Sequence, residues 1–175
     1  ENKYRNYKVR TFSDNIFIEV KLDEHAFFSL GVNNEGNISN ILRNLSDFQN
    51  TLFRKYGFFI RGAIVYGEVY SDENIIYGKG IIEAVEGEKK AVFPRIIISE
   101  DLKKIIDDNR KSYDGDEYWG DKTLIKLDNY PEYFLNYLDD MDYQWIEKLL
   151  EKHKELIEQK IEKFRNNEKI LKKYE

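Results

Sequence analysis

The sequence has no cysteine, one methionine, two prolines and two histidines among its 175 residues. Without cysteine the chain can form no disulfide, thiolate zinc site or thiol nucleophile, which fits a reducing cytoplasm. His25 and His153 offer little to a Ser-His-Asp triad or a multi-histidine metal site, and we expect both at the surface. No apolar run approaches the roughly 20 residues that cross a bilayer, and the first residues do not form a signal peptide. We therefore expect a cytoplasmic protein without a membrane segment.

Apolar and charged residues are both plentiful. Hydrophobic residues make up 41% of the chain and aromatic residues 15%, enough for the folded core of one domain. Charged residues reach 35%, but their signs nearly cancel to a net charge of -5. Such a chain is poorly suited to nucleic-acid binding by counterion release, and we expect no nucleic-acid partner. A single nucleotide needs only a local group of cations or a metal ion.

Short β-prone runs alternate with segments of helical spacing. The pattern predicts first a hairpin over 7–12 and 15–20, a connection over 21–37, and a helix over 38–53 with Asn37 as cap and Gly57 as stop. A buried strand over 58–65, two short runs over 68–70 and 75–77, a helix over 78–90 and a buried strand over 95–99 follow. The chain then continues with a helix over 100–108, a polar loop over 107–121, a hairpin over 123–127 and 133–137, and one long helix over 142–174. This order predicts an α+β fold with the sheet covered on one face.

The predicted order lacks one β–α element of a known fold. With such an element before the first hairpin, it would be the split βαββαβ of the ferredoxin-like, or palm, fold. We expect residues 1–110 to form this core without its first strand. Residues 111–175, a hairpin and a long helix, are expected to pack on the core as an extension of the same domain.

Asp14 lies at the turn of the first hairpin, between two hydrophobic strands. A carboxylate held there projects toward the end of the sheet, where Mg²⁺ can bind. The alternative is that an aspartate at a turn only satisfies backbone donors.

Three blocks after this hairpin have a recognisable order. Residues 59–67 read FIRGAIVYG, residues 76–84 read IYGKGIIEA, and residues 94–96 read PRI. With the preceding Phe12-Ser13-Asp14, the series resembles the consecutive blocks of class III nucleotide cyclases. It is most similar to the small bacterial Pycsar-type enzymes that make cyclic pyrimidine nucleotides in antiphage defence. The resemblance spans most of the chain from Val9 onward and includes the tyrosine-rich hairpin and the charged last helix.

The resemblance implies a mechanism in which two aspartates hold two Mg²⁺ or Mn²⁺ ions on a nucleoside triphosphate. The ions neutralise charge on the phosphates while the 3′-hydroxyl attacks the α-phosphorus and pyrophosphate leaves. Asp14 matches the second metal aspartate. The first would lie on a strand upstream of Glu1, and we expect the natural sequence to continue there; otherwise the protein cannot hold two metals.

The resemblance also implies which residues contact the base. Arg10 occupies a position that is usually a lysine in purine cyclases, and Ile75 replaces its acidic partner. An arginine donates to carbonyl oxygens such as those of uracil or cytosine, which favours UTP or CTP over purines. The alternative, that Arg10 is an exposed strand residue, carries equal weight.

The expected transition-state residues are absent. Ile82 and Glu86 stand where the family has an asparagine and an arginine, so we expect the cation to be Arg61 or Arg95. A structural ion pair of either arginine with Glu83 or Glu86 is an equal alternative.

One further residue is a weaker candidate for the phosphates. Lys79, between Gly78 and Gly80 at a helix start, can approach phosphate with its backbone N–H groups. The tyrosines over 113–143 and the apolar stripe from Trp145 to Phe164 are expected to pack the tail rather than bind bases.

The resemblance implies a homodimeric cyclase that makes cUMP or cCMP, which then acts on a separate effector protein. Two alternatives stay open. The first is a catalytically silent cyclase-like module that binds a nucleotide or dimerises. The second is a palm-fold enzyme that joins two nucleotides into a cyclic dinucleotide.

Overall fold

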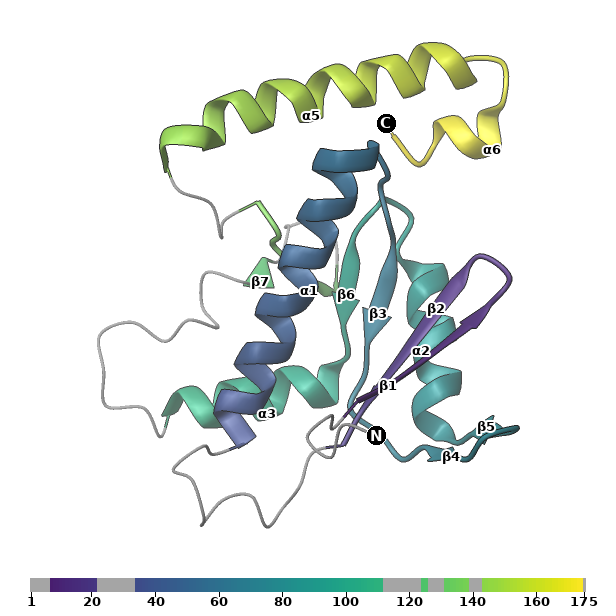
Figure 1. Ribbon diagram of the computed structural model, residues 1–175, viewed down its shortest axis with the longest axis vertical. Helices are drawn as coiled ribbons and strands as arrows, with labels where there is room; N and C mark the ends of the chain where they lie inside the picture. The colour runs from purple at the N-terminus through teal and green to yellow at the C-terminus, as the bar shows by residue number, and fades with distance from the viewer. Residues whose placement is uncertain (1–6, 22–33, 112–123, 126–130, 139–142, 175) are drawn as a thin grey trace. The chain divides into compact units, whose positions relative to one another are not determined.

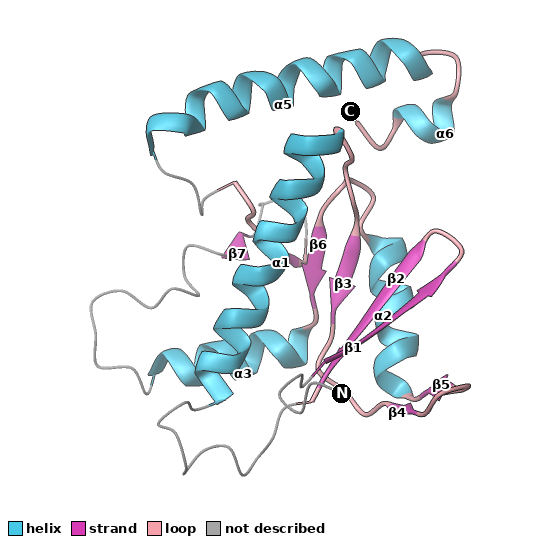
Figure 2. Cartoon of the chain, in the orientation of Figure 1, coloured by secondary structure: helices cyan, strands magenta, loops and turns pink. Residues whose placement is uncertain are grey.

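The computed structural model describes residues 7–21, 34–111, 124–125, 131–138 and 143–174 (Figure 1). The chain divides into two compact units, Glu1–Asn40 and Ile41–Glu175. Helices and short strands alternate along it, as Figure 2 shows, and the α+β class predicted from the sequence is confirmed. None of the described helices combines the length and the apolar character that a bilayer crossing requires.

The first unit contains the hairpin that the sequence predicts, with the predicted bounds. Strands β1 (Tyr7–Phe12) and β2 (Asn15–Val20) pair antiparallel from Tyr7 opposite Val20 to Phe12 opposite Asn15. Ser13, the first of two turn residues, has a φ of 55°, as in a type II′ turn. Because side chains alternate along a strand, the register places six residues on one largely apolar face: Tyr7, Val9, Thr11, Ile16, Ile18 and Val20.

Helix α1 (Asn34–Tyr56) begins before the predicted cap and ends where the sequence predicts. Asn37 lies inside the helix, so the predicted cap was wrong. A glycine costs a helix only about 1 kcal/mol relative to alanine, and Gly36 therefore does not stop the first turn. At the other end Gly57 has a φ of 63°, and its N–H donates to the carbonyl of Phe53 at 2.9 Å. This left-handed cap ends the helix.

The second unit contains a four-stranded sheet in the order β3-β6-β8-β7. Its strands are β3 (Gly62–Ile64), β6 (Ile96–Ile98), β8 (Tyr133–Leu135) and β7 (Leu124–Ile125). Strands β3 and β6 are parallel, and the other pairs are antiparallel. All three residues of β6 are buried, as expected for a central strand with an uninterrupted apolar run.

Strand β3 is shorter than the predicted strand over 58–65. The Phe58 N–H bonds to the carbonyl of Leu52 at 3.3 Å, which ties this residue to the end of α1 instead of a strand. Phe58 is accordingly 60% exposed.

The connection between β3 and β6 contains a small hairpin and then a helix. Strands β4 (Tyr70–Ser71) and β5 (Ile76–Tyr77) pair antiparallel about Asp72, whose Oδ1 accepts from the N–H groups of Asn74 and Ile75, both at 2.8 Å. Helix α2 (Lys79–Lys90) follows and packs on β3 and β6. Gly87 lets the helix approach closely, because a Cβ there would stand 2.7 Å from the Cβ of Ala63.

Helix α3 (Glu100–Lys111) continues three residues beyond its predicted end and into the predicted loop. Lysine–aspartate pairs three or four residues apart support the polar last turns: Lys103–Asp107, Lys104–Asp101 and Lys111–Asp108. The rest of the predicted loop over 107–121 lies outside the described residues. The β7–β8 pairing confirms the predicted second hairpin.

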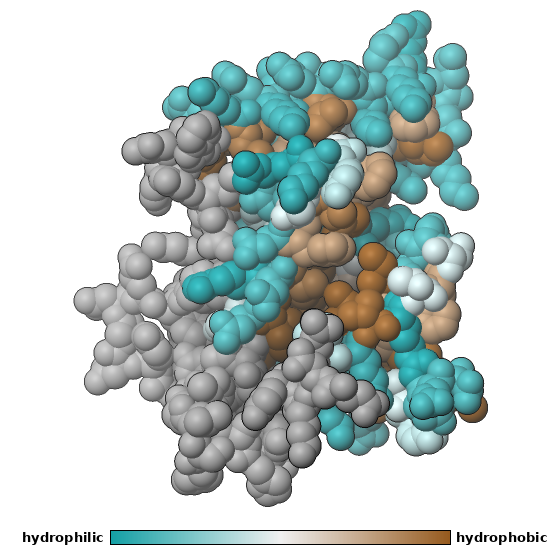
Figure 3. Space-filling model, in the orientation of Figure 1, coloured by the Kyte–Doolittle hydropathy of each residue, from teal (hydrophilic) through white to brown (hydrophobic). Residues whose placement is uncertain are grey.

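The tail is two helices rather than the single predicted one. Helix α5 (Tyr143–Phe164) is followed by a break at 165–167 and helix α6 (Glu168–Leu171). The Asn167 side chain accepts from the Ile170 N–H at 3.3 Å and caps α6. Asparagine favours caps over helix interiors, which explains the break at Asn166–Asn167. Polar side chains cover α5 on the face visible in Figure 3; on its other side Leu149 is buried.

Candidate functional site

The hairpin presents Asp14 at its exposed turn. The carboxylate accepts one hydrogen bond, from Asn15 Nδ2 at 3.2 Å, and is otherwise open to solvent. Arg10 lies on β1 opposite Phe17, on the face away from the apolar one, and is partly exposed. The antiparallel pairing therefore fixes the Asp14 backbone while leaving its side chain accessible, as a metal ligand requires.

Arg61 immediately precedes β3 and forms an ion pair with Glu88 of α2. The sequence suggested Glu83 or Glu86 as partners, and the structure gives Glu88 instead. Both side chains keep about a third of their surface exposed, at 35% for Arg61 and 27% for Glu88. The pair joins the start of the strand to the last turn of the helix.

Arg95 precedes β6 in the same way but is buried, at 6% exposure. Its guanidinium lies 5.6 Å from the ring centre of Phe93 and 5.3 Å from that of Phe134. Cation–π attraction to the two rings offsets part of the cost of burying this charge. Arg95 therefore packs the core, and the prediction that it contacts substrate is not supported by its position.

Lys79 is exposed and pairs with Glu83 at 3.3 Å. The backbone around it is already engaged, because the Gly80 N–H donates to the carbonyl of Glu68 at 3.0 Å. A Cβ on Gly78 would stand 2.4 Å from that same carbonyl oxygen. The two glycines thus allow close backbone packing here, and the Gly80 N–H is not available to a phosphate.

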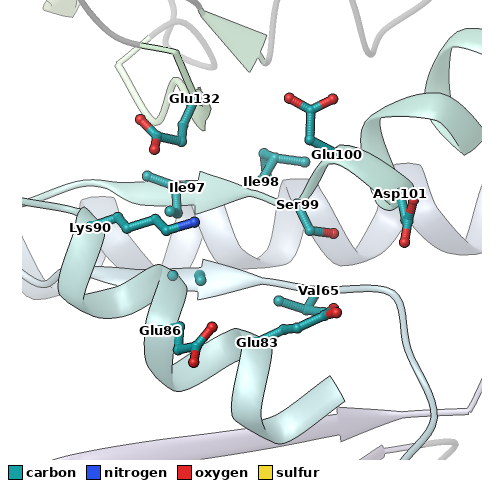
Figure 4. A pocket seen from close by; sticks show the side chains of 12 residues that line it. Val65, Glu83, Glu86, Lys90, Ile97, Ile98, Ser99, Glu100, Asp101 and Glu132 are labelled. Carbon is teal, nitrogen blue, oxygen red and sulfur yellow. The ribbon is translucent and has the colours of Figure 1, made fainter. Parts of the chain in front are cut away.

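A cavity of about 320 Å³ opens at the carboxyl ends of β3 and β6 (Figure 4). Its apolar part is formed by Ala63, Val65, Ile97 and Ile98. Five carboxylates surround it: Glu83 and Glu86 from α2, Glu100 and Asp101 from α3, and Glu132 before β8. Lys90 is the one cation among the lining residues. Of the predicted residues in this unit, Arg61, Lys79 and Arg95, none lines the cavity.

The sequence analysis did not single out this cavity. The carboxyl ends of parallel strands are where open α/β sheets usually bind ligands, and the signal was the acidic start of the helix directly after the strand at 96–98. The net negative charge of the residues that line the cavity repels a triphosphate that has no bound cations. Among the described residues, no three Asp, Glu or His side chains are grouped so that they could hold a metal ion.

The histidine and tyrosine predictions have mixed outcomes. His153 is half-buried among aromatic rings, so its expected place at the surface was wrong. His25 lies outside the described residues. Tyr133 packs under the Lys103 ammonium at 4.5 Å, and the Tyr137 hydroxyl is hydrogen-bonded to His153 Nε2. These two tyrosines pack the tail as predicted. The Trp145 side chain is outside the described region.

The comparisons with protein-family models, curated proteins and solved structures gave no match to this chain.

Proposed function

We propose that the chain belongs to a metal-dependent nucleotide cyclase that converts UTP or CTP to the 3′,5′-cyclic monophosphate and pyrophosphate. In this proposal the core is a palm fold, and the enzyme is a cytoplasmic homodimer that uses two Mg²⁺ or Mn²⁺ ions. Its product acts on a separate effector in a Pycsar-type antiphage response. The support is the ordered series of sequence blocks together with the geometry of the first hairpin.

The observation that carries the proposal is the exposed Asp14 carboxylate at a two-residue turn between paired strands. A metal that must align a 3′-hydroxyl with an α-phosphorus needs a ligand with a fixed backbone. The paired strands supply that rigidity, and the exposed Asp14 side chain accepts a hydrogen bond from its neighbour Asn15. Arg10 would bind the pyrimidine carbonyl from the other subunit.

Exposure favours Arg61 over Arg95 as the transition-state cation. Arg95 is enclosed by Phe93 and Phe134, whereas Arg61 keeps a third of its side chain exposed. We assign the role to Arg61, which would leave Glu88 for the triphosphate when substrate and metal bind. Lys79, whose ammonium is exposed, would contribute only through its charge.

The test is to incubate the natural full-length protein with each NTP and Mn²⁺ and to identify the products by mass spectrometry. We expect cUMP or cCMP from the wild type, and a loss of at least ~100-fold in Asp14→Asn, because the metal-bound charge is removed. Asp47→Asn changes another exposed aspartate, on α1, and is the matched control that keeps activity. A cyclic mononucleotide made equally well by Asp14→Asn would refute the assignment.

A catalytically silent module is the second candidate. It is favoured by the Arg61–Glu88 and Lys79–Glu83 pairs, which already satisfy the two cations inside the chain. Absence of product from every NTP, together with nucleotide binding or dimerisation, would support this candidate. A cyclic dinucleotide would instead indicate the other palm-fold activity.

A further inference from the structure

The C-terminal arm, residues 143–174, contacts the end of α1 through His153. The His153 ring lies 4.7 Å from the ring centre of Phe53, the last core residue of α1, and 5.0 Å from that of Phe59. Its Nε2 is hydrogen-bonded to the hydroxyl of Tyr137. The end of α1 with the residues that follow it, and the residue two after β8, therefore meet on the imidazole of α5.

Three further contacts connect the C-terminal arm to the end of α1 and to the residues that follow it. Lys152 Nζ donates to the carbonyl of Arg54 in the last turn of α1, at 2.9 Å. The methyl groups of Leu156 lie 3.7 Å from the place of a Cβ on Gly57. After α6, Tyr174 meets Phe59 at 6.0 Å with the two rings nearly perpendicular. Among these contacts, the one at His153 involves the group that titrates near neutral pH.

We propose that His153 makes the attachment of the C-terminal arm sensitive to pH: the neutral imidazole holds the arm on α1, and protonation loosens it. In the neutral imidazole Nε2 can accept from the Tyr137 hydroxyl, whereas in the imidazolium it can only donate to the hydroxyl oxygen, so protonation fixes the direction of this hydrogen bond. A charged ring would also lie half-buried against Phe53, Phe59 and Tyr137 and would lose part of its hydration there.

Among the described residues, the contacts of His153 include no carboxylate that would compensate this charge. From α1 and the segment before β3 it meets two phenyl rings, and from the residue two after β8 a tyrosine hydroxyl. Its neighbours on α5, Lys152 and Lys154, are cations, engaged with the Arg54 carbonyl and with Glu158. Tyr174, a second tyrosine near this histidine, contacts the ring of Phe59.

The direction of the pH response follows from burial. Burial lowers the pKa of His153 below its ordinary value of 6.5. Between that lowered pKa and 6.5 the loosened state binds more protons than the attached state. The attachment is therefore at full strength above pH 6.5 and weakens as the pH falls through this window. None of these contacts includes a residue of the proposed cyclase site, so the response holds with or without that activity.

The first experiment is an NMR titration of the histidine ring protons in the full-length protein. With His25→Gln, the signal of His153 is identified directly, and we expect its pKa below 6.5. Attraction of the cation to the surrounding rings acts in the opposite direction. A His153 pKa at or above 6.5 in the folded protein would overturn the proposal.

The second experiment compares amide hydrogen-exchange protection of α5 at pH 7 and pH 5. We expect wild-type protection factors to fall about fivefold at pH 5, because the attached arm would have to bury the charge of the imidazolium. The fall should persist in the His25→Gln control and disappear in His153→Phe, which keeps an aromatic ring but cannot titrate. A pH-dependent loss of equal size in His153→Phe would contradict the proposal. If that variant does not fold, the titration of His153 still decides.

Discussion

At the scale of single residues, two glycines of the second unit are required for different reasons, one for space and one for backbone conformation. Gly87 faces β3 from α2, and a Cβ there would stand 2.7 Å from Ala63 and 3.5 Å from Ile97. Gly57 adopts a φ of 63° at the end of α1. The sequence identified Gly57 as a helix stop, because glycine after an apolar helical stripe is a local signal. It could not identify the role of Gly87, which depends on a strand 24 positions earlier.

Gly87→Ala is predicted to destabilise the protein by up to about 2 kcal/mol. Overpacking costs about 1–3 kcal/mol, and the better helix propensity of alanine returns only part of this, about 1 kcal/mol. Urea denaturation of the variant measures the change. Ala63→Gly in the same chain removes the opposing methyl group and should recover a large part of the loss. If the double variant were no more stable than Gly87→Ala, the clash would not be its cause.

Gly57→Ala is predicted to cost about 1 kcal/mol, because a Cβ disfavours the left-handed conformation by about that amount. The space itself is adequate, since the nearest atoms are methyl groups of Leu156 at 3.7 Å. Gly57→Asn should cost less, because asparagine tolerates this conformation. Thermal denaturation of the two variants checks the order, and equal losses would show that crowding, not backbone strain, decides.

At the scale of elements, most helices and strands were predictable because their signals are local. The first hairpin, α2 and β6 follow from alternation, helical spacing and an apolar run. The errors came where a distant or capping contact competes with propensity. Phe58 bonds back to α1, Asn167 caps a new helix, and lysine–aspartate pairs extend α3 to Lys111. Such errors reflect contacts that periodicity does not encode.

The junction of α5 with α1 provides an element-level prediction. Lys152 donates to a free carbonyl at the end of α1, where a cation is also favoured by the helix dipole. Lys152→Ala should destabilise the protein by about 0.5–1 kcal/mol. Lys154→Ala, which removes only an exposed pair with Glu158 at 3.9 Å, should change stability by about half as much or less. Paired urea curves measure both, and an equal effect would argue against the capping role of Lys152.

At the scale of the whole molecule, the site was far less predictable than the fold. The sequence identified Asp14, Arg10, Arg61, Arg95 and Lys79 through resemblance, but only the structure shows that Arg95 is buried and Arg61 is paired with Glu88. The acidic cavity was missed because its lining comes from β3, α2, β6 and α3 and from the segment before β8. Convergence of side chains in space has no signature in a single sequence.

Global stability should fall at alkaline pH because of Tyr137. Burial raises the pKa of its hydroxyl well above the ordinary value of 10. Above pH 10 the unfolded chain releases this proton while the folded chain retains it, so stability is full below pH 10 and decreases as the pH rises. Urea curves between pH 9 and pH 11 should show this loss, and Tyr137→Phe should reduce its slope. An unchanged slope in that variant would assign the loss to other groups.

The parallel pairing of β3 with β6 has a kinetic consequence. These strands are 34 positions apart, and both a hairpin and a helix intervene between them. Local turns can form in microseconds, whereas this ladder must wait until the intervening helix has docked. The central sheet should therefore be among the last parts to mature during synthesis, and its apolar strand stays vulnerable to aggregation until then.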